Sequence, residues 1–381
     1  MDSSVSDEVY QNQILAHVSR TFALTIPQLP PALRRGVTNA YLLCRIADTI
    51  EDQTHASAAA RQALLHRFVG VLSGREEAGR LVRDLASRLA EHILPAERDL
   101  ILNMARIVRL TATLGTAQRA AIEHCVAVMC DGMHMFQRIA SVNGLARMRD
   151  LDEYCYYVAG VVGEMLTQLF CAYAPAIERQ RPGLEKLSVS FAQGLQMTNI
   201  LKDVWEDREH GACWLPQEIF SKHGVELGAL APGKQSAGFA GGMRELVGVA
   251  HAHLRNALSY TLLIPRAEVG IRRFCLWAIG LALLTLRKIE HTPGFTEGAQ
   301  VKISHAAVGT IQLLSNAAVR HDWLPRWLFD LAAAGLPLAT PGAFDPPTRL
   351  PTADVRGASE FDEDVSPAAQ PDLRAEGSSS R

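Results

Sequence analysis

Two acidic clusters of identical form point to a site for a divalent metal ion. Residues 48–52 read Asp-Thr-Ile-Glu-Asp and residues 203–207 read Asp-Val-Trp-Glu-Asp. Both have the form D-x-x-E-D, and both lie in apolar sequence that is typical of a helix. One such cluster is usually a solvated helix face, whereas two indicate carboxylates that meet around a cation. The candidate metal ligands are Asp48, Glu51, Asp52, Asp203, Glu206 and Asp207.

Helical spacing extends each cluster into a narrow polar stripe. Tyr41, Arg45, Asp48 and Asp52 share one face of the first helix, because residues three or four apart are neighbours on a helix surface. The residues between them are apolar. A solvated face would be broadly polar instead. The second stripe has the same spacing and contains Gln196, Asn199, Asp203 and Glu206/Asp207.

The chemistry of these stripes follows from the repulsion between their carboxylates. Carboxylates that face each other across a cavity repel one another. A hard divalent cation removes this repulsion, and Mg²⁺ prefers oxygen ligands and often completes its shell with substrate phosphate. The sequence therefore predicts a metal-assisted departure of diphosphate, in which the metal neutralises charge on the leaving oxygens.

The elements that must position these stripes are long helices. Ala, Leu, Arg, Glu and Gln dominate the chain to about residue 340, and alternating β-branched runs are missing. We expect one all-α domain over residues 1–340, without internal repeats. From residue 341 the chain is rich in Pro, Ser, Gly and acidic residues, which predicts a disordered tail over 341–381. The predicted helices include 31–52, 57–73, 76–92, 96–112, 117–140, 151–173, 184–208, 239–262, 267–289 and 303–318.

Composition excludes several functional classes. The 381-residue chain is 48% hydrophobic with a formal net charge of -2, so it lacks the basic surplus of a nucleic-acid-binding protein. Seven scattered cysteines without a CxxC pair fit a reducing compartment, and the polar, acidic N-terminus does not read as a signal peptide. The longest apolar stretch, 275–286, is too short to span a bilayer. We expect a cytoplasmic monomer that an apolar substrate brings peripherally to a membrane.

A third helix, predicted over 151–173, carries aromatic and small residues. Tyr154, Val158, Val161 and Met165 lie along one predicted face, and two glycines allow close packing. Core packing explains this face on its own. Alternatively, the face lines an apolar channel in which aromatic rings stabilise a carbocation.

Several motifs, in this order, resemble the squalene/phytoene synthases, which are head-to-head prenyl transferases. They are SRTFA at 19–23, YLLCRIADTIED at 41–52, YCYYVAGVVGE at 154–164, QMTNILKDVWED at 196–207 and WLPQEIF at 214–220. The resemblance covers residues 10 to 320 and implies an all-α isoprenoid-synthase fold around a central cavity. It also implies that two farnesyl diphosphates condense to presqualene diphosphate, with Mg²⁺ or Mn²⁺ as the metal.

The resemblance assigns roles residue by residue. Asp48, Asp52, Asp203 and Asp207 would bind magnesium that is bridged to diphosphate, and Tyr154 would act in proton loss and cation rearrangement. The diphosphate-binding residues would be Ser19, Arg20, Arg45 and Lys202. The cavity would be shaped by Phe22, Tyr41, Val158 and Gln196.

The last step of the reaction has several possible outcomes within the resemblance. The segments PQEIF and Val301-Lys302-Ile303 are similar to squalene synthases, which reduce the cation with NADPH. Asn199 and Lys302 would then bind the cofactor. Dehydrosqualene and phytoene synthases need no reductant, and some relatives add water to give hydroxysqualene. Ser304 departs from the arginine common at that position, and residues 211–213 lack the family's arginine.

Two other functional classes remain as alternatives. Some proteins of this fold are non-catalytic assembly factors, which would be expected to lose the acidic clusters. Chain-elongating prenyltransferases also use paired acidic motifs but typically show DDxxD. Both clusters of this chain read D-x-x-E-D, which favours the head-to-head enzymes.

Overall fold

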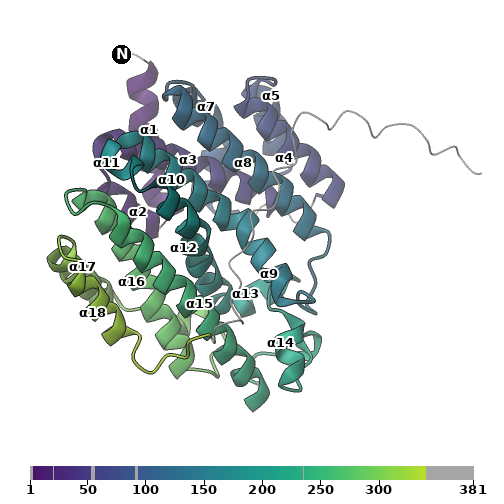
Figure 1. Cartoon of the computed structure of the whole chain (residues 1–381). Helices are drawn as coiled ribbons and strands as arrows, with labels where there is room; N and C mark the ends of the chain where they lie inside the picture. Colours follow the sequence, from purple (N-terminus) through teal and green to yellow (C-terminus); the bar gives the residue numbers. More distant parts are fainter. Residues whose placement is uncertain (1–2, 20, 53–55, 91–92, 235, 340–381) are drawn as a thin grey trace, which may run out of the picture. The chain divides into compact units, whose positions relative to one another are not determined.

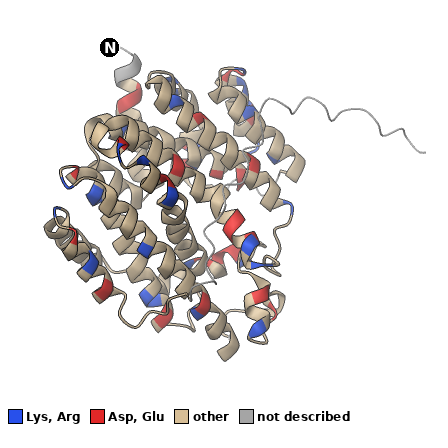
Figure 2. Cartoon of the chain, viewed as in Figure 1, with Lys and Arg blue, Asp and Glu red and all other residues tan. Residues whose placement is uncertain are grey.

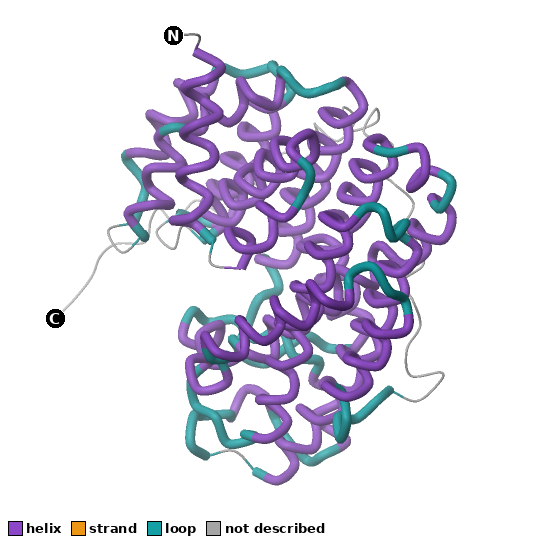
Figure 3. Tube along the Cα trace, turned by 90° about the vertical axis from the view of Figure 1, so that its left-hand side faces the viewer, coloured by secondary structure: helices purple, strands orange, loops and turns teal. Residues whose placement is uncertain are grey.

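Helices form nearly all of the regular structure of this chain, as its Ala- and Leu-rich sequence predicts. The computed structural model describes residues 3–19, 21–52, 56–90, 93–234 and 236–339. Within these ranges there is no β-strand, only an isolated parallel bridge between Leu145 and Pro216. Figure 3 shows helices joined by short loops. The all-α expectation is confirmed.

Most helices in the first half of the chain lie close to the ranges predicted from the sequence. The expected helix over 96–112 is interrupted at Asn103, and the N-terminal helix was not predicted. The elements are α1 (Ser3–Val18), α2 (Thr21–Thr25), η1 (Ile26–Gln28), α3 (Pro31–Glu51), α4 (Ala58–Leu72), α5 (Ala78–Ala86), α6 (Pro95–Leu102), α7 (Met104–Ala112), α8 (Thr116–Gln137), α9 (Met148–Cys155), η2 (Tyr156–Gly160), α10 (Val161–Tyr173) and α11 (Pro175–Glu178).

The second half adds a helix pair that the sequence analysis only partly predicted. The helices over 217–222 and 323–332 were not predicted, and the predicted helix over 184–208 is divided at Asp203. The helices over 237–263, 269–291 and 305–318 lie close to their predicted ranges. The elements are α12 (Arg181–Lys202), α13 (Val204–Glu209), α14 (Gln217–Lys222), η3 (Leu227–Ala229), α15 (Ala237–Leu263), α16 (Val269–His291), η4 (Gly298–Val301), α17 (His305–Ala318) and α18 (Trp323–Ala332).

The packing places α12 at the centre. It contacts α15, α10 and α16, while α8 contacts α10, α3 and α4 (Figure 1). Most of each helix is tan in Figure 2, with charged residues as separate segments. The apolar faces therefore meet in one core, which includes the fully buried side chains Leu42, Phe170 and Phe220.

One compact unit covers Met1–Pro347 and contains all of these helices. The predicted tail over 341–381 lies outside the described residues, so its disorder remains a prediction. Two segments, Met148–Tyr173 and Val269–His291, are long and apolar enough to be candidate membrane spans. More than half of the apolar window of each is buried inside the structure, as is common for core helices.

A buried histidine links α12 to α15. His253 is 1% exposed, and its Nδ1 lies 2.9 Å from the Ser190 hydroxyl, which also accepts a hydrogen bond from Asn256 at 3.0 Å. Burial lowers the pKa of His253 from 6.5 to about 3. His251 is also buried, and its Nδ1 lies 2.7 Å from the Pro337 carbonyl. Both histidines are core residues.

The low pKa of His253 predicts acid sensitivity. Between pH 6.5 and about 3, the unfolded chain binds a proton at this residue that the folded chain does not. The free energy of unfolding should therefore fall as pH decreases through this window, by ~1.4 kcal/mol per pH unit from this group. Urea denaturation of wild type and His253→Asn at a series of pH values measures the slope. The exposed His124→Asn variant is the control and should keep the wild-type slope; an unchanged slope in His253→Asn contradicts the assignment.

Candidate functional site

An apolar cavity of about 400 Å³ lies between α3, α8, η2, α10, α12 and α16. Acidic and basic side chains of α3 stand on one side of its lining, and most of the remaining wall is apolar or aromatic. Every predicted cavity-shaping residue, Phe22, Tyr41, Val158 and Gln196, lines it. The polar and aromatic lining also includes Arg45, Asp48, Glu51, Asp52, Tyr154 and Asn199.

The first acidic cluster is presented by the C-terminal end of α3. This helix begins at Pro31, where the missing proline N–H costs nothing, and Asp52 is its C-cap. Arg45, one turn earlier, lies 3.7 Å from Asp48 and also forms an ion pair with Glu97 of α6. The predicted stripe of Tyr41, Arg45, Asp48 and Asp52 is confirmed, since all four line the cavity.

Desolvation dominates the electrostatics of this cluster. Burial, together with the charges of Asp52 and Glu97, raises the pKa of Asp48 to about 7. Burial and the neighbouring aspartates raise the pKa of Glu51 to about 8, and burial also raises the pKa of Asp52. The charged forms are therefore disfavoured until a cation is close. Burial lowers the pKa of Arg45, but Asp48 and Glu97 outweigh it and raise that pKa overall.

The second cluster lies across a break between two helices. The predicted continuous helix over 184–208 is wrong in this respect, because α12 ends at Lys202 and Asp203 is the residue between α12 and α13. The Asp207 N–H still donates to the Asp203 carbonyl at 2.9 Å, so the two side chains keep helical spacing. Burial raises the pKa of Asp203, and burial with the charges of Asp203 and Glu206 raises the pKa of Asp207 to about 7.

The two clusters approach each other, although only the first lines the cavity. The charge of Asp52 adds to burial in raising the pKa of Asp207. His210 opposes burial by lowering the pKa of both Asp52 and Asp207. Asp203, Glu206 and Asp207 do not form part of the cavity lining. The charges of the two clusters therefore act on each other, and the first cluster also lines the cavity.

The Glu206 carboxylate forms a hydrogen bond that connects the second cluster to a later segment of the chain. Its Oε1 accepts a hydrogen bond from Gly298 N at 2.7 Å, and Trp205 donates to the Phe295 carbonyl at 2.8 Å. These bonds fasten the segment that precedes Lys302 to the second cluster. The Oε2 of Glu206 is buried with no hydrogen-bond partner among the described residues.

The carboxylates of the two clusters suit a cation, such as Mg²⁺, that takes few protein ligands. No group of three or more His, Cys, Asp or Glu side chains in the described ranges is arranged to hold a metal ion. Mg²⁺ commonly takes one or two carboxylates and completes its octahedron with water and phosphate oxygens. The buried Glu206 Oε2 and the raised pKa values of Asp48 and Asp207 mark negative charge that a cation would stabilise.

Tyr154 of α9 lies between two aromatic rings. It stacks on Trp214 with centroids 4.1 Å apart and an interplanar angle of 10°, and Phe136 meets it edge-on at 5.2 Å. Burial, with the charges of Glu51 and Asp207, raises the pKa of Tyr154 well above its ordinary value. The phenol therefore stays neutral at neutral pH, on the cavity wall and near both clusters.

The helix after Tyr154 contains a π-helical turn, η2. One wider turn changes the phase of the residues that follow it. Val158 still lines the cavity, but Val162 takes the place predicted for Val161, which is buried at 1% exposure outside the lining. The prediction of a continuous face through Val161 is thus wrong, while the channel interpretation of this helix is supported by Tyr154, Val158 and Met165.

Three of the remaining predicted site residues have contacts outside the cavity lining. Ser19 accepts a hydrogen bond from Phe22 N at 2.9 Å, at the junction of α1 and α2. Lys202 forms an ion pair with Asp203 at 3.0 Å, and Lys302 lowers the pKa of Asp203 against the larger effect of burial. None of these three lines the cavity. Arg20 lies outside the described residues.

Three residues near the site were not among the predicted site residues. Glu97, in the first turn of α6, forms an ion pair with Arg45. The two residues are 52 positions apart, so no local sequence pattern indicates this contact. Trp214 stands in the quoted WLPQEIF segment but its contact with Tyr154 has no helical spacing. His210 lies near both clusters, because its charge opposes burial in setting the pKa of Asp52 and of Asp207. Arg208 donates to the carbonyls of Val142 and Leu230, so its guanidinium is already bonded.

Comparison with known proteins places the chain in a family. The family model for squalene/phytoene synthase matches residues 15–307. The squalene synthase of Candida albicans is 29% identical over 299 residues, or 76% of this chain and 63% of its own. The squalene synthase of Cyberlindnera jadinii is 30% identical over 292 residues, or 74% of this chain and 61% of its own. The chain thus spans about three fifths of the length of these curated relatives.

Solved structures share the fold. A ligand complex of TcSQS matches with a TM-score of 0.70 and 23% identity, over 86% of this chain and 91% of the other. A dehydrosqualene synthase in complex with a ligand matches with a TM-score of 0.60 and 21% identity, over 83% of this chain and 98% of the other. The predicted isoprenoid-synthase fold is confirmed.

The close approach of α10 and α12 at the cavity wall gives a test. A Cβ on Gly163 would lie 2.2 Å from the Ser188 carbonyl oxygen, which is backbone and has little freedom to move. Gly163→Ala should lower the free energy of unfolding by ~1–3 kcal/mol, measured by urea denaturation. Gly36→Ala is the matched control, because a Cβ there meets nothing within 4 Å and should stabilise its helix by ~0.5–1 kcal/mol. Equal stability of the two variants contradicts the packing argument.

Proposed function

Because the chain belongs to the squalene/phytoene synthase family, we propose that it is a magnesium-dependent farnesyl-diphosphate farnesyltransferase that makes squalene with NADPH. It joins two farnesyl diphosphates head to head to give presqualene diphosphate, which is then reduced. The observation that carries the proposal is the pair of D-x-x-E-D clusters in electrostatic contact beside an apolar cavity lined by Tyr154.

The cavity suits a substrate with a charged head and an apolar chain. Its walls from α8, α10 and α16 are apolar, for example Met129, Leu166 and Phe274, and would hold the isoprenoid chains away from water. Arg45, whose guanidinium Asp48 and Glu97 hold in place, is the cavity-lining cation closest to the first cluster and suits a diphosphate oxygen. When bound to Asp48, Asp52, Asp203 and Asp207, Mg²⁺ would neutralise the charge of the departing diphosphate.

Aromatic side chains support the cationic stage of the reaction. Loss of diphosphate leaves an allylic cation, and the faces of aromatic rings attract cations. Phe22 and Tyr41 form a ring pair at 4.9 Å on one side of the cavity, and Tyr154 lies on another. The neutral phenol of Tyr154 keeps its proton near the reacting carbons and presents no phenolate that the cation would alkylate. Trp214, stacked beneath it, holds its ring orientation.

The reductive last step would use Asn199 and Lys302. Asn199 lines the cavity and the positive charge of Lys302 acts on Asp203, so both suit a cofactor that approaches from η4. Ser304, however, caps α17 by accepting a hydrogen bond from Ala307 N at 3.2 Å. It therefore offers no substitute for a phosphate-binding arginine. Release of dehydrosqualene without NADPH is the second candidate, and the absence of an arginine at position 304 favours it.

A product assay tests the proposal. Purified protein with farnesyl diphosphate and Mg²⁺ should release squalene when NADPH is present, detected by gas chromatography with mass spectrometry. Dehydrosqualene in equal amounts with and without NADPH contradicts the reductive step. A strong preference for geranylgeranyl diphosphate, with phytoene as the product, contradicts farnesyl diphosphate as the substrate. The paired variant Asp48→Asn/Asp203→Asn should lose turnover and keep its helical circular dichroism. Asp131→Asn on α8 replaces an exposed carboxylate that pairs with His66 and should stay active.

The Arg45–Glu97 pair gives a second test. Glu97→Gln removes the carboxylate that fixes Arg45 but keeps the side-chain size. The value of kcat/KM for farnesyl diphosphate should fall about tenfold, equivalent to ~1.4 kcal/mol of transition-state binding. Glu76→Gln is the control, since Glu76 forms a similar pair with Arg67 on α4, outside the cavity lining. Wild-type kcat/KM in Glu97→Gln excludes a role for this pair.

A further inference from the structure

Exposed apolar side chains gather at the C-terminal helix pair, away from the catalytic cavity. Of thirteen large hydrophobic residues that are exposed in the described ranges, six lie between residues 313 and 338. Leu313 is 71% exposed, Trp323 66% and Trp327 56%. Large aromatic residues are seldom left in water without a function. This C-terminal patch, defined as Leu313, Leu314, Trp323, Trp327, Leu331 and Leu338, therefore needs an occupant.

The patch follows helical spacing. Trp323, Trp327 and Leu331 stand four residues apart and form one outward stripe on α18. The neighbouring α17 contains no Asp, Glu, Lys or Arg. The two helices contact each other, so the stripe on α18 and the exposed leucines of α17 belong to one apolar surface.

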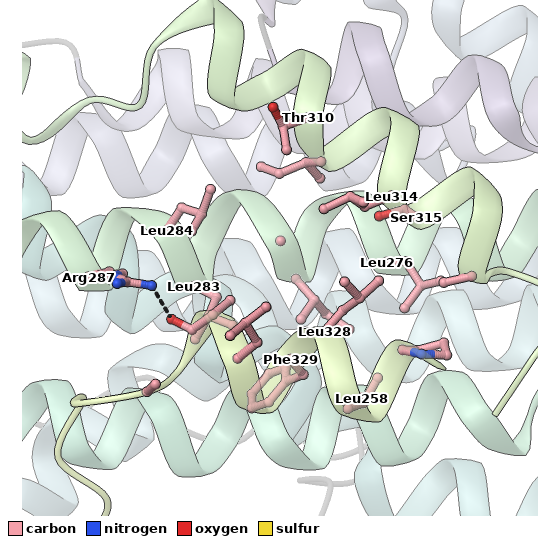
Figure 4. Close-up of a pocket in the computed structure, with 18 residues that line it drawn as sticks. Leu258, Leu276, Leu283, Leu284, Arg287, Thr310, Leu314, Ser315, Leu328 and Phe329 are labelled. Carbon is pink, nitrogen blue, oxygen red and sulfur yellow. Dashed lines mark hydrogen bonds between the residues drawn. The ribbon is translucent and has the colours of Figure 1, made fainter. Parts of the chain in front are cut away.

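An apolar pocket of about 410 Å³ lies between α16, α17 and α18 (Figure 4). Its walls include Leu283 and Leu284 of α16, Leu314 of α17 and Leu328 of α18. Leu314 and Leu331 are pocket-lining residues that are also exposed. The pocket therefore opens on the C-terminal patch and has room for the end of an alkyl chain.

The inner side of α18 is firmly held, so its outward face does not result from loose packing. The buried Arg272 donates to the Val319 carbonyl at 2.9 Å and to Asp322 at 2.6 Å, at the start of α18. At its other end, Arg287 donates to the Ala332 carbonyl at 3.3 Å (Figure 4). His251 then binds the Pro337 carbonyl. The tryptophans thus face outward on a helix that is anchored at both ends.

The charges around the patch are predominantly positive. Asp322 is paired with Arg266 and Arg272, and Asp330 with Arg255 at 3.1 Å. Arg320 and Arg326 are exposed, and neither forms an ion pair within the described residues. Tryptophans that stand beside unpaired arginines are typical of the boundary between lipid headgroups and acyl chains.

We propose that α17 and α18 dock the protein on an anionic lipid surface. Trp323 and Trp327 insert at headgroup level, Arg320 and Arg326 bind lipid phosphates, and the pocket accepts the end of an acyl chain. Such a docking surface is monotopic and requires no spanning helix. It lies outside the catalytic cavity, and the inference holds whichever isoprenoid product the cavity makes.

Two other occupants fit the patch less well. Residues 340–381 are rich in Pro, Ser and acidic residues and have few apolar side chains for a pocket of this kind. In a symmetric dimer each copy would present the same patch. Arg320 and Arg326 of the two copies would then meet like charge in a desolvated interface. A lipid surface supplies both the apolar depth and the negative charge.

Docking would also bring lipid close to the catalytic cavity. The helix α16 is the shared wall, since Phe274 and Ala278 line the cavity whereas Leu276, Ile279 and Leu283 line the pocket. One helix is about 10 Å thick. An apolar product would leave the cavity near the surface that can dissolve it.

Vesicle flotation of the full chain tests the proposal. Wild type should float with phosphatidylcholine vesicles that contain phosphatidylglycerol, and the Trp323→Gln/Trp327→Gln variant should show about tenfold weaker binding. The control Leu94→Gln/Leu102→Gln removes two exposed leucines from the region of α6 and should float like wild type. Arg320→Gln/Arg326→Gln should lose about tenfold in affinity for the anionic vesicles and little for pure phosphatidylcholine.

Several results would overturn the docking surface. They are failure of wild type to float, equal flotation of the tryptophan variant, or no effect of the arginine variant on anionic vesicles. A dimer in analytical ultracentrifugation that the tryptophan variant abolishes, without vesicle binding, would assign the patch to a second copy instead. Thermal denaturation should show unchanged Tm, because all four substituted side chains are exposed. Turnover in detergent should match wild type, which separates docking from catalysis.

Discussion

Removal of water from a group of carboxylates is the constraint on which the site depends. Asp48, Glu51 and Asp207 each have a raised pKa because they lie in desolvated positions close to one another. Such an arrangement opposes folding unless cations compensate it. Arg45 and Lys202 compensate part of the charge. The helices around the cavity must therefore supply enough apolar packing to hold an electrostatically unfavourable group in place until substrate and metal arrive.

That packing comes mainly from α12 and its neighbours. The central helix contacts α15 and α10, and the clash predicted for any Cβ at Gly163 shows how close two of these backbones lie. The link between Ser190 and the buried His253 joins the same helix to α15. The apolar half of the molecule thus fixes the position of the helix end that carries Asp203, while α6 fixes Arg45 through Glu97.

Local periodicity predicted the parts of this site that lie on single helices. The stripe from Tyr41 to Asp52 and the pair Gln196 and Asn199 followed from residues three and four apart, and the family motifs added Tyr154. Contacts between distant segments carried no such signal, and these include Glu97 with Arg45 and Trp214 with Tyr154. The break at Asp203 was also missed, because its sequence continues the helical pattern without proline or glycine. The C-terminal helix α18 escaped prediction since Pro325 stands within its first turn.

The π-helical turn η2 has a consequence for how this chain tolerates change in length. The turn contains one more residue than an α-helical turn, and each residue advances a helix by about 100°. Loss of one residue between Tyr156 and Gly160 would let the segment become a regular helix and keep every downstream hydrogen bond. Because the residue lost is the extra one, the downstream side chains would keep their directions relative to Tyr154, and Val162 would stay on the cavity wall. A one-residue deletion, which would turn the downstream face of an α-helix by about 100°, is therefore a change in length that this turn can absorb.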